Sequence, residues 1–385
     1  MGKITLKTPI QNDKYTEYVY GAFDIQDSDF SEVVIDYDLK EAKEFDWNIG
    51  LIYGSSGSGK TSLLKRMGTL DVVELDPDKA LISNFDWLSP KDATMLLTSM
   101  GLSSVPTWLR PYDKLSNGER YRAELAYKVG RAKQGEVVLI DEYTSVVNRD
   151  VAKAMSFALQ KYVRKKGLKI ILASCHYDIV EWLMPDWLCS PQKGGTLERG
   201  DCLRHGRPNI ELQVSRVEAD TWDLFKKHHY LTEKTNKSFG YLLFTWKGNP
   251  VGIVVYKPQP NGYIKNSYAL SRTVVLPDFQ GMGIGSKISE FTAAILKESG
   301  KRVFTKTVNP ALGEYRNRSD SWRGTSKNGM FRADIKGKNK KYRNTLKRTS
   351  YCHEYVGDNV EGYSELLLTV KEMRNNKEKN YELVQ

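Results

Sequence analysis

The chain has 385 residues, of which 40% are apolar, and a formal net charge of +11 at pH 7. This length predicts about two domains. No run approaches the roughly 18 consecutive apolar residues of a membrane-spanning helix, and the N-terminus lacks a signal-peptide pattern. The four cysteines are irregularly spaced, which argues against a disulfide framework. We therefore expect a cytoplasmic protein that does not span a membrane.

Residues 1–190 read as alternating strands and helices. Three apolar runs, Ile49–Tyr53, Val137–Ile140 and Lys169–Ala173, are followed by polar residues at their carboxyl ends. Continuous apolar runs of this kind are typical of parallel strands covered on both faces, and ligands bind at the carboxyl ends of such strands. The pattern predicts an α/β fold with a site at one edge of its sheet.

A complete phosphate-binding loop follows the first of these strands. It reads Gly54-Ser-Ser-Gly-Ser-Gly-Lys60-Thr61, and we expect it to bind a nucleotide triphosphate. Lys60 is expected to reach the β- and γ-phosphates, and the Thr61 hydroxyl to ligate Mg²⁺. The expected nucleotide-binding residues of this loop are Gly54, Ser55, Gly57, Gly59, Lys60, Thr61 and Ser62.

Two acidic residues end the second strand. Asp141 stands where a carboxylate holds the metal, and Glu142 is expected to act as general base on the attacking water. The intervening Leu115-Ser116-Asn117-Gly118-Glu119 would by itself be an ordinary helix-capping turn. Together with the first loop, however, it is similar to the signature sequence of ABC-type ATPases.

The resemblance to ABC-type ATPases covers nearly all of residues 20–190. Asp141-Glu-Tyr-Thr-Ser145 looks like the family's Walker B segment, and His176 matches its switch histidine. The resemblance implies a homodimer on ATP binding, with Ser116, Gly118 and Glu119 of one subunit closing on ATP held by the other. Tyr20 and Phe23 are alternative candidates for stacking on adenine.

Three features depart from the family pattern. No glutamine stands in the expected place after the phosphate-binding loop, where the sequence reads Ser83-Asn84-Phe85-Asp86, and Asn148 occupies the usual aspartate position of the D-loop. About 55 residues separate Lys60 from Ser116, fewer than in transporters. Because the chain also lacks a membrane-spanning segment, we expect an ABC protein that is not part of a transporter.

Residues 191–208 are rich in glycine, proline and charge and are interpreted as a linker. The pattern then changes to a hairpin, Tyr241–Trp246 and Val251–Tyr256, joined by the turn Lys-Gly-Asn-Pro. A strand over 270–276, a glycine loop, a helix over 286–299 and a strand over 302–308 follow. This order predicts a mixed-sheet α+β domain.

The glycine loop Gln280-Gly-Met-Gly283-Ile-Gly285 resembles the acyl-coenzyme A motif of GNAT-family N-acetyltransferases. The resemblance implies that backbone amides of the loop and of the following helix hold the pyrophosphate of acetyl-CoA or another acyl donor. The residues implied in cofactor binding are Val275, Gln280, Gly281, Gly283, Gly285 and Ser286.

Catalytic residues of this second site are less sharply defined. Tyr315 matches the family's general-acid tyrosine, although its spacing is one residue short, and the alternative is a packed aromatic side chain. His228 and His229 are candidates for a general base, with a partly buried histidine pair as the alternative.

Nearly all of the excess positive charge lies between Arg316 and Arg348, a segment that contains twelve lysines and arginines but only two aspartates. This basic segment (residues 316–348) is either a solvated loop or a contact for a polyanion. Interleaved aromatic residues, Tyr315, Trp322, Phe331 and Tyr342, favour nucleic acid, and Trp322 and Tyr342 are expected to stack on bases. Cys189, Cys202 and His205 supply only three ligands, so a zinc site is not favoured.

As a whole, the chain resembles prokaryotic and phage proteins in which an ABC-type ATPase is fused to a GNAT-like acetyltransferase. We expect an ATPase domain over 1–190, a linker over 191–208, an acyltransferase domain over 209–372 and a charged, frayed tail over 373–385. The leading hypothesis is an ATP-dependent acyltransferase that acts on nucleic acid. The alternatives are a nucleic-acid-binding ATPase of repair or translation type whose second domain only binds, and an acyltransferase for a protein or small amine.

Overall fold

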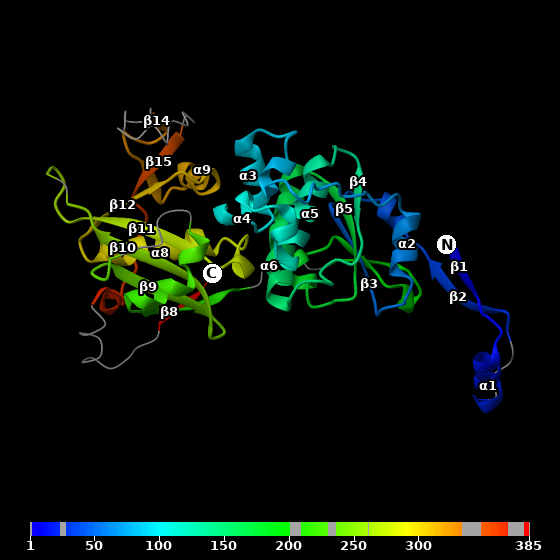
Figure 1. Ribbon diagram of the computed structural model, residues 1–385. Coiled ribbons are helices and arrows are strands. Elements are labelled where there is room, and N and C mark those ends of the chain that lie inside the picture. Colours follow the sequence, from blue (N-terminus) through cyan, green and yellow to red (C-terminus); the bar gives the residue numbers. More distant parts are fainter. Residues whose placement is uncertain are drawn as a thin grey trace. The chain divides into compact units, whose positions relative to one another are not determined.

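Figure 1 shows the computed structural model, which describes residues 2–23, 28–200, 209–229, 236–260, 262–332, 348–368 and 381–384. The chain forms two compact units. The first comprises Met1–Val73, Arg131–Val147 and Gln160–Arg207, and the second comprises Glu74–Gly130, Asn148–Leu159 and Pro208–Gln385. Most of residues 74–159, which we expected to belong to the first domain, therefore group with the C-terminal half.

A five-stranded sheet with the order β4-β5-β3-β6-β7 forms the centre of the first unit. Its strands are β3 (Ile49–Tyr53), β4 (Val137–Ile140), β5 (Lys169–Ser174), β6 (Trp187–Cys189) and β7 (Leu197–Arg199). The first four are parallel, and only β7 is antiparallel to its neighbour. Every residue of β3 is buried, as expected of a strand covered on both faces. The three strands and the parallel sheet predicted from the apolar runs are confirmed.

The core of this unit explains one glycine of β3. A Cβ atom at Gly50 would lie 2.0 Å from the ring of Trp187, so no larger residue fits there. Trp187 is fully buried and meets Trp47 edge to face, with ring centroids 5.6 Å apart. Helical elements of this unit include η1 (Lys40–Lys43), α2 (Lys60–Arg66), α7 (Val180–Leu183) and η4 (Pro191–Lys193), together with the end of α6 (Arg149–Lys166) from residue 160 on.

An antiparallel pair of strands precedes β3. β1 (Gly2–Pro9) and β2 (Phe30–Tyr37) align Ile4 with Ile35, and these two side chains are buried. The helix α1 (Lys14–Phe23) lies between them in the chain and has no buried residue. This pair of strands thus packs on the core of the unit through Ile4, Ile35 and the partly buried Tyr37.

The second unit contains a helical part. Its elements are η2 (Leu81–Asn84), α3 (Pro90–Ser99), α4 (Val105–Leu109), η3 (Tyr112–Lys114), α5 (Asn117–Arg131) and the start of α6 (Arg149–Lys166). The sequence explains where α3 begins: the Ser89 hydroxyl caps it by accepting from the Asp92 N–H, and Pro90 follows at the first helical position. The rings of Phe85, Trp87 and Tyr127 pack together within this part, with centroids 5.0–6.3 Å apart.

A mixed sheet with the order β13-β15-β12-β11-β10-β9-β8-β16 forms the rest of the second unit. Its strands are β8 (Glu211–Arg216), β9 (Gly240–Trp246), β10 (Asn249–Pro258), β11 (Ser267–Val275), β12 (Arg302–Thr307), β13 (Trp322–Gly324), β15 (Arg348–Tyr355) and β16 (Tyr381–Val384), and β14 (Met330–Arg332) pairs with β15. β11 and β12 are parallel, whereas the other neighbours in this order are antiparallel. The predicted mixed-sheet fold is confirmed.

The helix α8 (Ile284–Glu298) packs on this sheet against β10, β11 and β12 (Figure 1). Ile284, Ile288, Phe291 and Ile295 are buried along its inner face, at the helical spacing seen in the sequence. The helix α9 (Pro310–Arg318) follows β12 and is capped by the Asn309 side chain, which accepts from the Leu312 N–H. The remaining short helices are η6 (Ala219–Leu224), η7 (Lys226–His228), η8 (Pro277–Phe279) and η10 (Ser364–Leu367).

Three details differ from expectation. The hairpin turns on Lys247 and Gly248, both with positive φ, so Asn249 and Pro250 of the expected turn already belong to β10. Residues 191–200 include η4 and β7 and extend the first sheet, rather than forming part of a linker. Tyr381–Val384 of the expected frayed tail pairs with β8, because an edge strand offers free backbone groups to an apolar segment.

Candidate functional site

The phosphate-binding loop connects β3 to α2. Gly54, Gly57 and Gly59 have φ of 155°, 79° and 89°, values that side-chain-bearing residues rarely adopt. The Lys60 ammonium donates to the Ser55 carbonyl at 2.7 Å, and Gly59 stands just before the first residue of α2. Ser55 and Thr61 are exposed, and Lys60 and Ser62 are partly exposed. The loop therefore presents its backbone and its lysine to solvent.

Gln192 contacts this loop and was missed in the sequence. Its Oε1 accepts from the Ser55 N–H at 3.0 Å, and its Nε2 donates to the Ser55 hydroxyl at 2.7 Å. These two atoms belong to a segment interpreted as a linker, 137 residues away in the chain. No local pattern marks such a contact.

The acidic pair and the histidine lie at the same sheet edge as the phosphate-binding loop, because β3, β4 and β5 are parallel and adjacent. Asp141 Oδ1 accepts from the Glu142 N–H at 2.9 Å. Glu142 is exposed and has a φ of 48°. Positive φ at a residue other than glycine is a strained conformation that is common at functional sites.

His176 is held by a residue of the same acidic segment. The His176 ring Nδ1 lies 3.0 Å from the Thr144 hydroxyl, and the His176 backbone N–H donates to the Ser174 hydroxyl at 3.0 Å. Thr144 is fully buried with a φ of 69°, an unusual value for a β-branched residue. The structure thus brings Asp141, Glu142 and His176 to one edge of the first sheet, as predicted.

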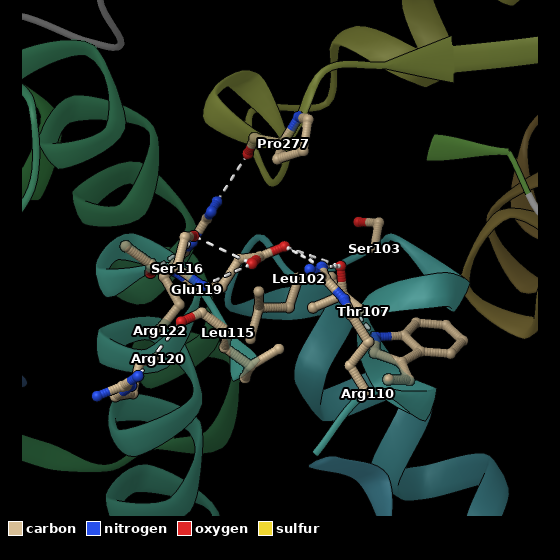
Figure 2. A network of polar contacts seen from close by, with 12 residues as sticks. Leu102, Ser103, Thr107, Arg110, Leu115, Ser116, Glu119, Arg120, Arg122 and Pro277 are labelled. Carbon is tan, nitrogen blue, oxygen red and sulfur yellow. Dashed lines mark hydrogen bonds and ion pairs between the residues drawn. The ribbon is translucent and has the colours of Figure 1, made fainter. Parts of the chain in front are cut away.

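The expected signature residues lie in the second unit and form a capping box at the start of α5. The Ser116 hydroxyl accepts from the Glu119 N–H at 3.3 Å, and Glu119 Oε2 accepts from the Ser116 N–H at 3.0 Å. Glu119 Oε1 accepts from Arg110 and from the Thr107 hydroxyl, both at 2.9 Å (Figure 2). Burial favours a higher pKa for Glu119, but the hydrogen bonds from Ser116 and Thr107 and the charge of Arg110 together lower that pKa.

The second glycine loop joins β11 to α8. Gly281 and Gly283 have φ of 90° and 84°, and Gly283 caps α8 in the left-handed conformation. The first N–H groups of α8 point along the helix axis toward the loop. Of these, the Ser286 N–H donates to the Gly283 carbonyl at 3.2 Å. A helix start of this kind is suited to a phosphate or pyrophosphate group.

The strands beside this loop separate. β11 and β12 pair from Ser267–Arg302 to Leu270–Thr305. Beyond that point β11 continues to Val275 in its pairing with β10, and β12 continues to Thr307 in its pairing with β15. Two strand edges that part in this way can align an extended ligand between them. The separation opens toward the end of β11 from which the glycine loop departs.

The side chain of Gln280 is engaged within the protein. Its Oε1 accepts from the Ser103 N–H at 2.7 Å, and its Nε2 donates to the Val275 carbonyl at 2.9 Å. The amide group that we expected at the cofactor thus ties the loop to residues 103 and 275.

The catalytic candidates of the second unit lie apart from the glycine loop in sequence. Tyr315 lies on α9 and donates to Glu290 Oε1 at 2.7 Å, and burial and this carboxylate raise the pKa of Tyr315 to about 12. Burial lowers the pKa of His228, and burial with the Arg272 charge lowers that of His229 to about 4. His229 also meets the Trp222 ring edge to face, so at neutral pH it is an uncharged, packed imidazole.

Trp322, in the described part of the basic segment, is buried and does not form an exposed stacking surface. Trp322 is 5% exposed, its ring packs against Tyr355, and the guanidinium of Arg316 lies 4.6 Å above it. Arg316 is itself buried and donates to the Thr305 hydroxyl. The prediction that Trp322 stacks on bases is therefore wrong, because the ring and its neighbouring cation pack on each other inside the unit. Tyr342 and residues 333–347 lie outside the described residues.

The remaining candidates concern adenine stacking and metal binding. Tyr20 donates to the Ser28 carbonyl, and the Phe23 side chain is 70% exposed. Among the described residues, no group of three His, Cys, Asp or Glu side chains is placed to hold a metal ion. Cys189 is buried, and Cys202 and His205 lie outside the described part. No helix of the described chain is long and apolar enough to cross a membrane.

The solved structures to which this chain is similar include ATP-binding cassettes and N-acetyltransferases. The chain is similar to the ATP-binding cassette MJ0796, solved as a dimer in a post-hydrolysis state with ADP and Pi, at 16% identity over 44% of this chain and 91% of that chain (TM-score 0.33). It is also similar to the ribosomal-protein-S18-alanine N-acetyltransferase from Escherichia coli, at 12% identity over 40% of this chain and 100% of that one (TM-score 0.28). A GNAT family acetyltransferase from Elizabethkingia anophelis with acetyl-CoA bound shares 17% identity over 37% of this chain and 97% of that one (TM-score 0.28).

A comparison with curated proteins finds no match. The family model of the Acetyltransferase (GNAT) family matches residues 209–317, which include β8 to β12, α8 and the glycine loop. Residues 209–317 are therefore a GNAT-type acetyltransferase domain, in agreement with the resemblance carried by Gln280–Gly285.

Proposed function

We propose that this protein is an ABC-type ATPase joined to a GNAT-type acyltransferase. The observation that carries the proposal is the presence of two phosphate-binding glycine loops, each at the start of a helix and each following a strand. The first lies at the sheet edge that also holds Asp141, Glu142 and His176. The second begins beside two parallel strands that separate.

In the ATPase, Lys60 and the loop amides would bind the phosphates, and Glu142 would accept a proton from the attacking water. Thr61 and Asp141 supply a hydroxyl and a carboxylate oxygen, a donor set that fits Mg²⁺. When bound, Mg²⁺ neutralises negative charge on the phosphate oxygens. His176, oriented by the Thr144 hydroxyl, would contact the γ-phosphate from the side of β5.

The signature residues support a homodimer. Ser116 and Gly118 lie at the start of α5, where helix N–H groups favour an anion. In the sandwich arrangement that the ABC resemblance implies, they would face the γ-phosphate bound by a second copy. The Ser116 hydroxyl now lies 3.0 Å from Glu119 Oε2, so it would have to exchange that carboxylate for the phosphate.

In the transferase, the amides of Gly283, Gly285 and Ser286 would hold the pyrophosphate of an acyl-coenzyme A, and the edges of β11 and β12 would align its extended arm. The Ser286 N–H now donates to the Gly283 carbonyl and would have to exchange it for a phosphate oxygen. The bound acyl donor supplies a thioester carbonyl for attack by an amine. Tyr315 is protonated at neutral pH, as a general acid must be, but its proton is shared with Glu290. His228 and His229 remain candidates for the general base.

The experiment that tests both activities uses the purified full-length chain. We expect ATP hydrolysis that requires Mg²⁺. We also expect acetyl-CoA to bind in calorimetry without nucleotide, because the second glycine loop (the acyl-CoA loop, residues 276–283, between β11 and α8) adjoins a separate sheet. If the protein binds ATP but no acyl-CoA compound, it is an ATPase whose second domain only binds another ligand. Absence of ATP binding would contradict the ATPase assignment.

For the acceptor we propose nucleic acid, on the basis of the charge of residues 316–348. Replacing Lys338, Lys340, Lys341 and Arg343 with glutamate is expected to abolish DNA and RNA binding while basal ATP hydrolysis stays nearly unchanged. In the unmodified protein, engagement of about five cations gives a slope of log K against log salt of about −4. Filter binding at several salt concentrations measures both. Unchanged affinity in the variant would favour a protein or small-amine acceptor.

A further inference from the structure

One buried arginine contacts both the signature motif and the acyl-CoA loop. Arg122 lies on α5, four residues after Gly118, and is 2% exposed. Its Nε donates to the Gly118 carbonyl at 3.1 Å, and its Nη1 donates to the Gly101 carbonyl at 3.1 Å and to the Pro277 carbonyl at 2.7 Å. Figure 2 shows the side chain extending from α5 toward Pro277. All of these residues belong to the second unit.

The chemistry of the guanidinium makes this contact specific. Its planar group carries five donors in a fixed fork, so one side chain can bond a carbonyl of its own helix and carbonyls of two other segments at once. A lysine ammonium at the end of a flexible chain would not reproduce that geometry. Because Arg122 is buried, a shift of any one of these carbonyls leaves a charged donor without its partner, which is costly.

The backbone around Arg122 supports a close fit. Gly101 and Gly281 both have positive φ, of 82° and 90°. A Cβ on Gly101 would lie 3.0 Å from the Gln280 carbonyl oxygen. A Cβ on Gly281 would lie 2.8 Å from the Ala158 Cβ. The hydrogen bond from the Ser103 N–H to Gln280 adds a second polar contact. The segment before α4 and the acyl-CoA loop are therefore packed backbone to backbone.

The same arginine links the proposed contacts of two ligands. The γ-phosphate held by a partner subunit would bind at Ser116 and Gly118, at the start of α5. The acyl-CoA pyrophosphate would bind at Gly283, six residues after Pro277 in the chain. The γ-phosphate would contact the start of α5, and the pyrophosphate would contact the start of α8. Arg122 bonds Gly118 at the start of α5 and Pro277 at the beginning of the loop that leads to α8, so it keeps these two segments in one arrangement.

We propose that Arg122 couples the two sites, so that closure of the ATP sandwich on the signature motif tightens acyl-CoA binding in the same subunit. The proposal rests on the proposed function and specifies how its two sites affect each other. Coupling between sites is reciprocal, so acyl-CoA must raise nucleotide affinity by the same factor. A factor of about 5–10 lies at the lower end of the usual range of such couplings.

The test measures acetyl-CoA affinity of the full-length protein by calorimetry, with and without saturating AMP-PNP and Mg²⁺, and then AMP-PNP affinity with and without acetyl-CoA. We expect both factors to be equal, at about 5–10. In Arg122→Lys, which keeps the charge, and in Arg122→Met, which removes it, the factor should fall to about 1 while each ligand still binds alone.

The control is Lys91→Met. Lys91 on α3 forms an ion pair with Glu314 on α9 at 3.1 Å, another contact between the helical part and the sheet part of this unit, but it is 54% exposed and remote in sequence from both loops. Its coupling factor should stay at that of the unmodified protein.

The outcomes are distinct. If either ligand fails to bind the unmodified protein alone, the proposed function is wrong, and the coupling with it. If both bind but the factor is 1, or if AMP-PNP weakens acetyl-CoA binding, only the coupling is wrong. Coupling that persists in both Arg122 variants, or that is lost equally in Lys91→Met, also overturns the role of Arg122.

Discussion

Replacing Glu142 with glutamine is expected to reduce ATP hydrolysis by about 10²–10⁴-fold and to leave an ATP-bound dimer. Glutamine keeps the size and shape of the side chain but cannot accept the proton of the attacking water. Asp141, which accepts from the residue-142 N–H, is untouched, so the metal and phosphate contacts should persist. Light scattering with saturating ATP and Mg²⁺ measures the dimer, and phosphate release measures hydrolysis.

Two further variants isolate the role of this carboxylate. Glu136→Gln makes the same substitution just before β4 at another exposed glutamate, and it should hydrolyse ATP like the unmodified protein. Lys60→Ala should weaken nucleotide binding itself, because the lysine contributes directly to the phosphate contacts. If Glu142→Gln stays monomeric with saturating ATP and Mg²⁺, the sandwich arrangement is wrong for this protein.

The sequence predicted those features that depend on neighbours in the chain. Ile49–Tyr53 and Val137–Ile140 are continuous apolar runs, and a run of this kind is itself the physical cause of a buried parallel strand. Glycines with positive φ mark both phosphate-binding loops for the same reason.

Contacts between distant segments were not predictable in this way. Gln192 meets Ser55 from 137 residues away, and Arg122 meets Pro277 from 155 residues away, and neither belongs to a motif. An arginine in a helical pattern is expected to be solvated. Arg122 is buried because the folded chain brings the carbonyls of Gly101 and Pro277, from two other segments, to its guanidinium.

Trp322 was misread for a related reason. An aromatic residue among basic residues suggests an exposed stacking surface. In the folded chain, Arg316 instead lies over the Trp322 ring, and both are buried. The charge counted from the sequence of a segment is therefore larger than the charge that a ligand can reach, wherever its cations are buried against aromatic rings of the same domain.

Replacing Gly283 with valine is expected to weaken acetyl-CoA binding at least tenfold and to abolish acyl transfer. Gly283 caps α8 at a φ of 84°, where a β-branched residue costs about 1–2 kcal/mol or more and where a side chain would stand between the pyrophosphate and the amides. Calorimetry with acetyl-CoA measures the loss, and ATP hydrolysis should be nearly unchanged.

The matched control for this variant is Gly300→Val. Gly300 lies just beyond the other end of α8, has a φ of 74°, and a Cβ there would meet no other atom within 4 Å. The two variants therefore impose a similar backbone strain on the same helix, but only residue 283 adjoins the proposed phosphate contacts. We expect both to lower the free energy of unfolding by a similar amount, measured by urea denaturation, and only Gly283→Val to lose acetyl-CoA. Equal losses of affinity would mean that the stability of α8, and not its N-terminal amides, governs binding, and full affinity in Gly283→Val would place the acyl donor elsewhere.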